Sequence, residues 1–105
     1  MASNETAIQS KIIDHLKKKE YFFVRLNNIP PFDPIQKTFR RMPKGSMKGL
    51  PDIMVLTDGG FVVFLEVKDK GKQSEDQKIF EQKCKEIGCE YHIVRSIDDV
   101  VEIGL

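Results

Sequence analysis

Residues 52–68 read DIMVLTDGGFVVFLEVK. Two apolar runs rich in β-branched residues flank the tripeptide Asp58-Gly59-Gly60, which is a strong signal for a β-hairpin. We therefore predict strands over residues 52–57 and 61–68. Both faces of these strands are apolar, as is typical of strands in the middle of a sheet that is covered on both sides. The hairpin thus predicts an α/β protein with a central sheet.

The length of the hairpin loop determines which residues face each other. If residues 58–60 form a three-residue loop, Asp52 lies opposite Glu66, whereas a two-residue loop would break this pairing. Opposed side chains have Cβ atoms about 4.5–5.5 Å apart, and like charges in such a pair are destabilising. Two carboxyl groups this close either share a proton or bind a cation. The period of two also places Lys68 on the same face as Glu66.

The N-terminal segment predicts a helix followed by a strand. Ile8, Ile12 and Leu16 recur at four-residue steps, so a helix over residues 4–19 would bury one stripe of side chains. The aromatic and β-branched residues at 21–26 predict a strand. These two elements precede the hairpin.

A second helix is expected after the hairpin. Ser74 and Gln77 fit a capping box, and Gly88 suits the position just after a helix C-terminus. The apolar stripe of this helix would contain Ile79, Phe80, Cys84 and Ile87.

The remaining residues predict a fourth strand over 90–95 and a short helix that Ser96 caps and that runs to about residue 103. A strand joined to the hairpin through a helix runs parallel to its neighbour. We therefore expect an α/β fold with an αβββαβ core, in which helices flank a mixed four-stranded sheet, followed by a short C-terminal helix. At 105 residues, positions 1–105 are expected to form one domain.

The composition excludes several classes of protein. The chain carries 17 basic and 16 acidic residues, so it is neither a uniformly basic nucleic-acid coat nor a highly charged disordered chain. It contains no apolar run near the roughly 20 residues of a membrane span, and residues 1–9 do not resemble a signal peptide. Its two cysteines, Cys84 and Cys89, are expected to be buried free thiols. An intracellular protein without a membrane segment is the expectation.

One segment is nevertheless strongly basic. Between residues 36 and 50 there are five basic residues and no acid: Lys37, Arg40, Arg41, Lys44 and Lys48. Such a cluster can bind phosphates without regard to sequence, and Gly45 and Gly49 would let a nucleic acid approach the backbone closely. A solvated loop is the alternative. If the chain acts on DNA, we expect these residues to contact it.

Three short motifs give the chain a resemblance to a known family. They are Gly49-Leu50-Pro51-Asp52-Ile53, Phe64-Leu65-Glu66-Val67-Lys68 and Ser74-Glu75-Asp76-Gln77. In this order and spacing they resemble the VRR-Nuc branch of the PD-(D/E)xK nuclease superfamily, in particular its small stand-alone members of the virus and phage type. The resemblance covers most of the chain and implies a restriction-endonuclease-like core.

The resemblance also implies roles for individual residues. Asp52, Glu66 and the main-chain carbonyl of Val67 would bind the metal, and Lys68 would be the catalytic lysine. Gln77 and Glu5 would complete the catalytic set. Each side chain also has a purely structural interpretation. Asp52 could satisfy the amides of a turn, and Glu66 and Lys68 could be solvated charges at a strand end. Gln77 could serve only as a helix cap, and Glu5 could be an ordinary first-turn acid favoured by the helix dipole.

A hard cation held by carboxylates suits phosphodiester hydrolysis, because it polarises the phosphoryl oxygen and activates water. We therefore expect a Mg²⁺- or Mn²⁺-dependent DNA endonuclease that resembles Holliday-junction resolvases and acts as a homodimer on four-way junctions. Two alternatives remain open at this stage. One is a restriction-type or nicking endonuclease on duplex DNA, and the other is a non-catalytic nucleic-acid-binding module.

Overall fold

The computed structural model describes residues 4–26, 32–33, 35, 38–39, 44–45 and 47–105. The helices are α1 (Asn4–Lys18), α2 (Glu75–Ile87) and α3 (Ile97–Glu102). The strands are β1 (Phe22–Arg25), β2 (Phe32–Asp33), β3 (Thr38–Phe39), β4 (Ile53–Thr57), β5 (Phe61–Val67) and β6 (Glu90–Val94). None of the helices in these residues has the length and apolar composition that crossing a membrane requires.

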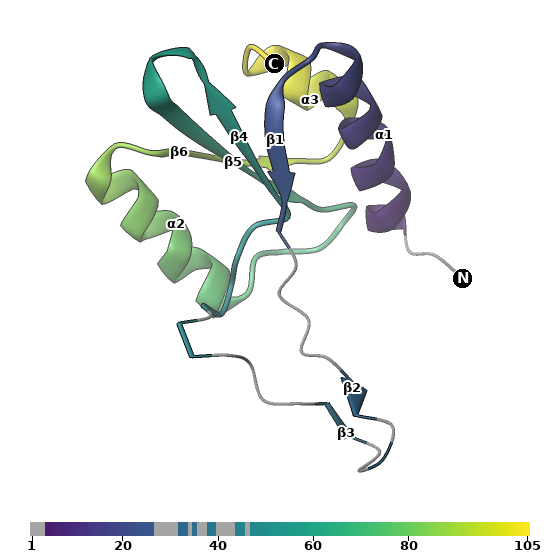
Figure 1. Ribbon diagram of the computed structural model, residues 1–105, viewed down its shortest axis with the longest axis vertical. Helices are drawn as coiled ribbons and strands as arrows, with labels where there is room; N and C mark the ends of the chain where they lie inside the picture. The colour runs from purple at the N-terminus through teal and green to yellow at the C-terminus, as the bar shows by residue number, and fades with distance from the viewer. Residues whose placement is uncertain (1–3, 27–31, 34, 36–37, 40–43, 46) are drawn as a thin grey trace.

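The main sheet has four strands in the order β1-β4-β5-β6 (Figure 1). β4 runs antiparallel to both β1 and β5, and β6 runs parallel to β5. The predicted αβββαβ order with a short terminal helix is therefore confirmed. The sequence did not predict β2 and β3, which pair with each other as two-residue strands and lie apart from the main sheet at the lower end of Figure 1. Strands this short leave no periodic signal.

The hairpin between β4 and β5 has the predicted three-residue loop. Asp58–Gly60 forms a single turn, and Thr57 pairs with Phe61 across it. Gly59 and Gly60 have φ angles of 83° and 78°, a conformation that costs glycine little and other residues more. The two glycines thus determine the loop length, and the loop length determines the register of the whole hairpin.

One face of the sheet packs against α1 and α3 and forms the hydrophobic core. Nine apolar residues, none more than 5% exposed, make up this cluster: Ile12, Leu16, Ile53, Val55, Val63, Leu65, Val67, Val94 and Val100. The C-terminus also lies against α1, because Nε2 of His15 is 3.2 Å from the carbonyl oxygen of Leu105. On this face the N-terminal helix α1 therefore contacts the C-terminal residue.

The other face packs against α2 (Figure 1). Phe64 on β5 meets Phe80 on α2 edge to face at 5.1 Å, and Phe80 lies 6.2 Å from Tyr91 on β6. The predicted apolar stripe of α2 is partly wrong. Ile79 and Ile87 are 53% and 79% exposed.

The reason for this error is that a helix buries only the stripe that meets the sheet. Phe80 and Cys84, one turn apart, lie on that stripe. Ile79 is rotated by about 100° from Phe80, and Ile87 is the last residue of the helix. Cys89 is only partly buried, so the predicted burial holds for Cys84 alone; both thiols are free.

Candidate active site

Two carboxyl side chains lie opposite each other at the open end of the hairpin. Asp52 directly precedes β4, and Glu66 lies near the end of β5. The ladder ends at the pair of Ile53 and Leu65, and just beyond it the Asp52 N–H donates to the Leu65 carbonyl at 3.1 Å. Glu66 projects on the face of the sheet that α2 covers, where Gln77 contacts it, and the Asp52 carboxyl group lies close enough to act on it electrostatically.

Glu66 is buried and only partly paired. It is 3% exposed, and it is the one buried charged side chain among the residues that the structure describes. Its Oε1 accepts a hydrogen bond from Gln77 Nε2 at 2.9 Å and lies 3.7 Å from Lys68 Nζ. Its Oε2 is buried without a hydrogen-bond partner in the described structure. An unpaired buried oxygen is costly unless a further ligand, such as a cation, completes it.

The surroundings raise the pKa of Glu66 from 4.5 to about 7. Burial is the largest cause, because it disfavours the charged form, and the negative charge of Asp52 adds to it. The positive charge of Lys68 acts in the opposite direction. Without a cation, Glu66 therefore favours its protonated form more strongly than an exposed carboxyl group does.

Asp52 is held in place by the backbone of β5. Its Oδ2 accepts a hydrogen bond from the Val67 N–H at 2.7 Å. In an extended strand the N–H and carbonyl of one residue face the same neighbouring strand. The Val67 carbonyl therefore lies on the Asp52 side of β5, just beyond the start of β4. Two carboxyl groups and a carbonyl thus gather at one end of the hairpin.

Gln77 caps α2 and also contacts the candidate site. Its Oε1 accepts from the Ser74 N–H at 2.9 Å, while the Ser74 Oγ accepts from the Gln77 N–H at 3.2 Å, which completes the capping box. Because the amide oxygen is used in the cap, the amide nitrogen faces Glu66 and donates to it. The helix cap therefore orients a hydrogen-bond donor toward the buried carboxylate.

Glu5 approaches the same region from the first turn of α1. A methyl group built on Gly71 would lie 3.8 Å from Glu5 Oε2 and 3.8 Å from Lys68 Cδ, so Gly71 lies close to both side chains. The charge of Glu5 also contributes to the raised pKa of Glu66. The structure thus brings all five predicted catalytic residues to one region: Glu5, Asp52, Glu66, Lys68 and Gln77.

The donor set suits a hard divalent cation. The described residues contain no group of three or more Cys, His, Asp and Glu side chains arranged for a metal. The site offers the carboxyl groups of Asp52 and Glu66, the latter with its Oε2 unpaired, and the Val67 carbonyl. Mg²⁺ is commonly bound by one or two carboxylates, with waters and substrate phosphates as its other ligands. The residues present therefore fit Mg²⁺ or Mn²⁺.

The basic segment is described only in part. Lys37, Arg40 and Arg41 lie outside the described residues, while Lys44 and Lys48 are exposed. Gly49 does not provide the close approach to a nucleic acid that the sequence suggested, because its backbone packs against α2. A Cβ there would lie 2.4 Å from the carbonyl carbon of Asp76, and Gly49 has a φ of 76°. This contact holds the end of the basic segment against the first turn of α2.

The contacts made by Gln73 and Arg95 were not predicted from the sequence. Gln73 Nε2 donates to Glu81 Oε1 at 3.1 Å and to the Tyr91 hydroxyl at 3.3 Å. Arg95, directly after β6, donates to two carbonyl groups of the loop that follows Lys68. These partners lie far apart in the chain, and no local sequence pattern predicts that they meet.

The comparisons with known proteins bear on the fold. No family model matches the chain, and no curated protein matches it. The chain is similar to a solved structure described as "VRR_NUC domain", with a TM-score of 0.70 and 20% sequence identity. The match covers 97% of this chain and 95% of that chain. The protein therefore has the fold of a VRR_NUC domain, as the resemblance of its motifs predicted.

Proposed function

We propose that this protein is a divalent-metal-dependent DNA endonuclease that hydrolyses phosphodiester bonds. The observation that carries the proposal is the pair formed by Asp52 and the buried Glu66, in which Glu66 Oε2 has no partner and Lys68 Nζ lies 3.7 Å from Oε1. A purely structural pair of acids would not leave a buried oxygen unsatisfied beside an ammonium group. The fold shared with a solved VRR_NUC domain supports the same conclusion.

The side chains would divide the chemistry between them. Asp52, Glu66 and the Val67 carbonyl would hold Mg²⁺ or Mn²⁺, which supplies a Lewis acid for the phosphoryl oxygen and lowers the pKa of water. Lys68 is 14% exposed, so its ammonium is available to orient the attacking water or to stabilise charge that develops on the phosphate. Gln77 and Glu5 would complete the set, with Gln77 keeping Glu66 in one orientation.

The substrate that we propose is branched DNA, with four-way junctions cut in the manner of a Holliday-junction resolvase. Exposed Lys44 and Lys48, together with Lys37, Arg40 and Arg41, would bind phosphates flanking the cut. A four-way junction has two-fold symmetry and needs two cuts, so the active form would be a homodimer. The products would carry 5′-phosphate and 3′-hydroxyl ends.

The test is cleavage of labelled DNA by purified protein in Mg²⁺, in Mn²⁺ and in chelator. Four-way junction, flap, fork, linear duplex and plasmid substrates are compared in parallel. We expect cleavage only with a divalent ion, and a loss of at least about a hundredfold for Asp52→Asn, Glu66→Gln and Lys68→Ala. Glu86→Gln is the matched control, because Glu86 is an exposed carboxylate on α2 whose Oε1 accepts a hydrogen bond from Gln82 at 3.3 Å.

Other outcomes would change the assignment. DNA binding that neither metal nor Asp52→Asn affects, without cleavage, would identify a non-catalytic binding module. Cleavage of duplex or plasmid DNA with no preference for junctions would favour a restriction-type or nicking enzyme. A protein that stays monomeric by light scattering, with and without junction DNA, would contradict the homodimer.

A further inference from the structure

Arg95 clamps the loop that follows the candidate catalytic lysine. Its Nη1 donates to the Asp69 carbonyl at 2.9 Å, and its Nη2 donates to the Gly71 carbonyl at 3.2 Å. One rigid guanidinium group therefore spans two carbonyl groups of the same loop. Lysine cannot make this contact, because its single ammonium does not have the planar fork of arginine.

Arg95 is itself held in place, so the clamp has a firm base. The backbone N–H of Arg95 donates to Asp99 Oδ2, in the first turn of α3, at 2.8 Å. The preceding residue, Val94, accepts a hydrogen bond from the Lys68 N–H at 3.1 Å, which continues the pairing of β5 with β6. Arg95 thus connects the first turn of α3, through its backbone, to the loop of residues 69–71, through its side chain.

A second contact restrains the same loop from α1. Asn4 Nδ2 donates to Asp69 Oδ2 at 3.0 Å. The loop is therefore fixed at its backbone by Arg95 and at a side chain by Asn4. Gly71, one of the two residues that Arg95 holds, lies close to both Glu5 and the aliphatic stem of Lys68. The path of the loop consequently limits where the Lys68 ammonium can lie.

We infer that Arg95 is a positioning residue, which holds the Asp69–Gly71 backbone so that Lys68 faces Glu66 and the scissile phosphate. This inference rests on the proposed function. Catalysis is sensitive to geometry, and a displacement of about 1 Å can cost about a hundredfold in rate. Arg95 acts through Lys68 and makes no contact of its own with the reacting atoms.

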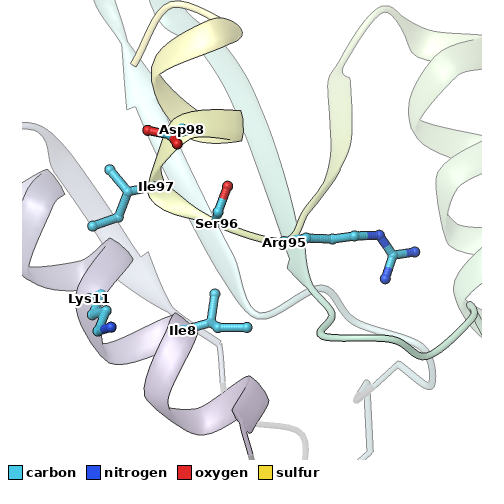
Figure 2. Close-up of a pocket in the computed structure, with 6 residues that line it drawn as sticks. All are labelled: Ile8, Lys11, Arg95, Ser96, Ile97 and Asp98. Carbon is cyan, nitrogen blue, oxygen red and sulfur yellow. The ribbon is translucent and has the colours of Figure 1, made fainter.

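A different role for Arg95, as part of an anion-binding cavity, is not favoured by the geometry. Arg95 lines a cavity of about 240 Å³ between α1 and α3, together with Lys11 and four other residues. In Figure 2 the Arg95 side chain extends away from Lys11 and Ile8, so the two cationic groups do not converge on one ligand. Its guanidinium is directed at loop carbonyls instead.

The first test is kinetic. We expect Arg95→Ala to lower kcat by about 10- to 100-fold with little change in the Kd for DNA measured in chelator, and Arg95→Lys to restore only part of kcat. In a Lys68→Ala background, Arg95→Ala should cost less than about twofold more, because residues that act as a unit are not additive. Lys11→Ala, which removes the other cation of the same cavity, should leave kcat unchanged.

The second test does not depend on catalysis. Amide hydrogen exchange at residues 69–71 of the full-length protein should become faster in Arg95→Ala and stay unchanged in Lys11→Ala. Unchanged exchange in Arg95→Ala would overturn the clamp even if the protein is a nuclease. If the wild-type protein cleaves nothing, the proposed function fails, while faster exchange would still establish the clamp.

Two kinetic outcomes would overturn the positioning role specifically. One is that adding Arg95→Ala to Lys68→Ala lowers kcat by the same factor as Arg95→Ala does in the wild type. The other is that Arg95→Ala binds DNA more weakly and that its DNA affinity depends less steeply on salt concentration, by about the amount of one phosphate contact. This result would make Arg95 a direct phosphate ligand.

Discussion

The two faces of the main sheet are built from the same strands but differ in composition and burial. The face toward α1 and α3 holds nine apolar residues that are almost completely buried. The face toward α2 carries Asp52 and Glu66 beside apolar residues that are only half-buried, such as Met54 and Leu56. At its β1 edge, Phe22 is 68% exposed. One face therefore supplies stability, and the other holds groups that a stable core would exclude.

This division explains how a small protein tolerates a buried, partly unpaired carboxylate. A network of polar groups in the core is costly when it is only partly satisfied. Here that cost falls on the α2 face, where Gln77 and Lys68 offset part of it. The apolar cluster on the opposite face is left intact. The comparison predicts that equivalent changes on the two faces have unequal effects.

The largest expected effect on stability comes from removing the same side chain from each face. Leu65 is fully buried on the α1 face, whereas Leu56 is half-buried on the α2 face. We expect Leu65→Ala to lower the free energy of unfolding by about 2–5 kcal/mol and Leu56→Ala by less than about 1.5 kcal/mol. Urea unfolding followed by circular dichroism measures both. Equal losses would show that the two faces contribute alike.

A smaller effect is expected from the titration of Glu66. Because the folded-state pKa of about 7 lies above 4.5, the folded protein binds more protons between these values, so stability falls as the pH rises from about 4.5 to about 7. The difference is of the order of 1–3 kcal/mol. Glu66→Gln should remove it, which makes this variant more stable than the wild type at pH 8 in chelator.

The measurement is urea unfolding at pH 5 and pH 8 for the wild type, Glu66→Gln and the control Glu86→Gln. Adding Mg²⁺ should reverse the trend for the wild type, since a metal ion binds the ionised carboxylate and stabilises the folded state. A pH dependence that is identical in the wild type and in Glu66→Gln would contradict the assignment.

The smallest effect compares the helix caps on the two faces. Ser74 caps α2 and Ser96 caps α3, each through its side-chain oxygen. Either change to alanine should cost about 1 kcal/mol of stability. Only Ser74→Ala should also weaken Mg²⁺ binding, by up to about tenfold, because the cap orients Gln77 toward Glu66. Calorimetric titration with Mg²⁺ measures the affinity of the Ser74→Ala and Ser96→Ala variants. Equal affinities would show that the cap of α2 does not affect metal binding.

Much of the candidate site could be predicted because it depends on local geometry. The Gly59-Gly60 loop determines the hairpin register from Thr57–Phe61 to Ile53–Leu65, and this register leaves Asp52 and Glu66 next to each other at the end of the hairpin. The capping box at Ser74 and Gln77 was equally visible. The same reasoning failed for Ile79 and Ile87, since periodicity shows that a helix has an apolar side but not how much of it a sheet covers.

The amino-acid sequence by itself determined the order of the elements, the register of the hairpin and the placement of two acids and a lysine at its end. These features follow from periods of two and 3.6 residues and from turns that only glycine adopts easily. Tertiary structure alone decided that α2 buries Glu66 and leaves its Oε2 unpaired, that Gly49 packs on Asp76, and that Arg95 reaches back to the loop after Lys68. Those contacts join distant parts of the chain, and their geometry exists only once the helices have packed onto the sheet.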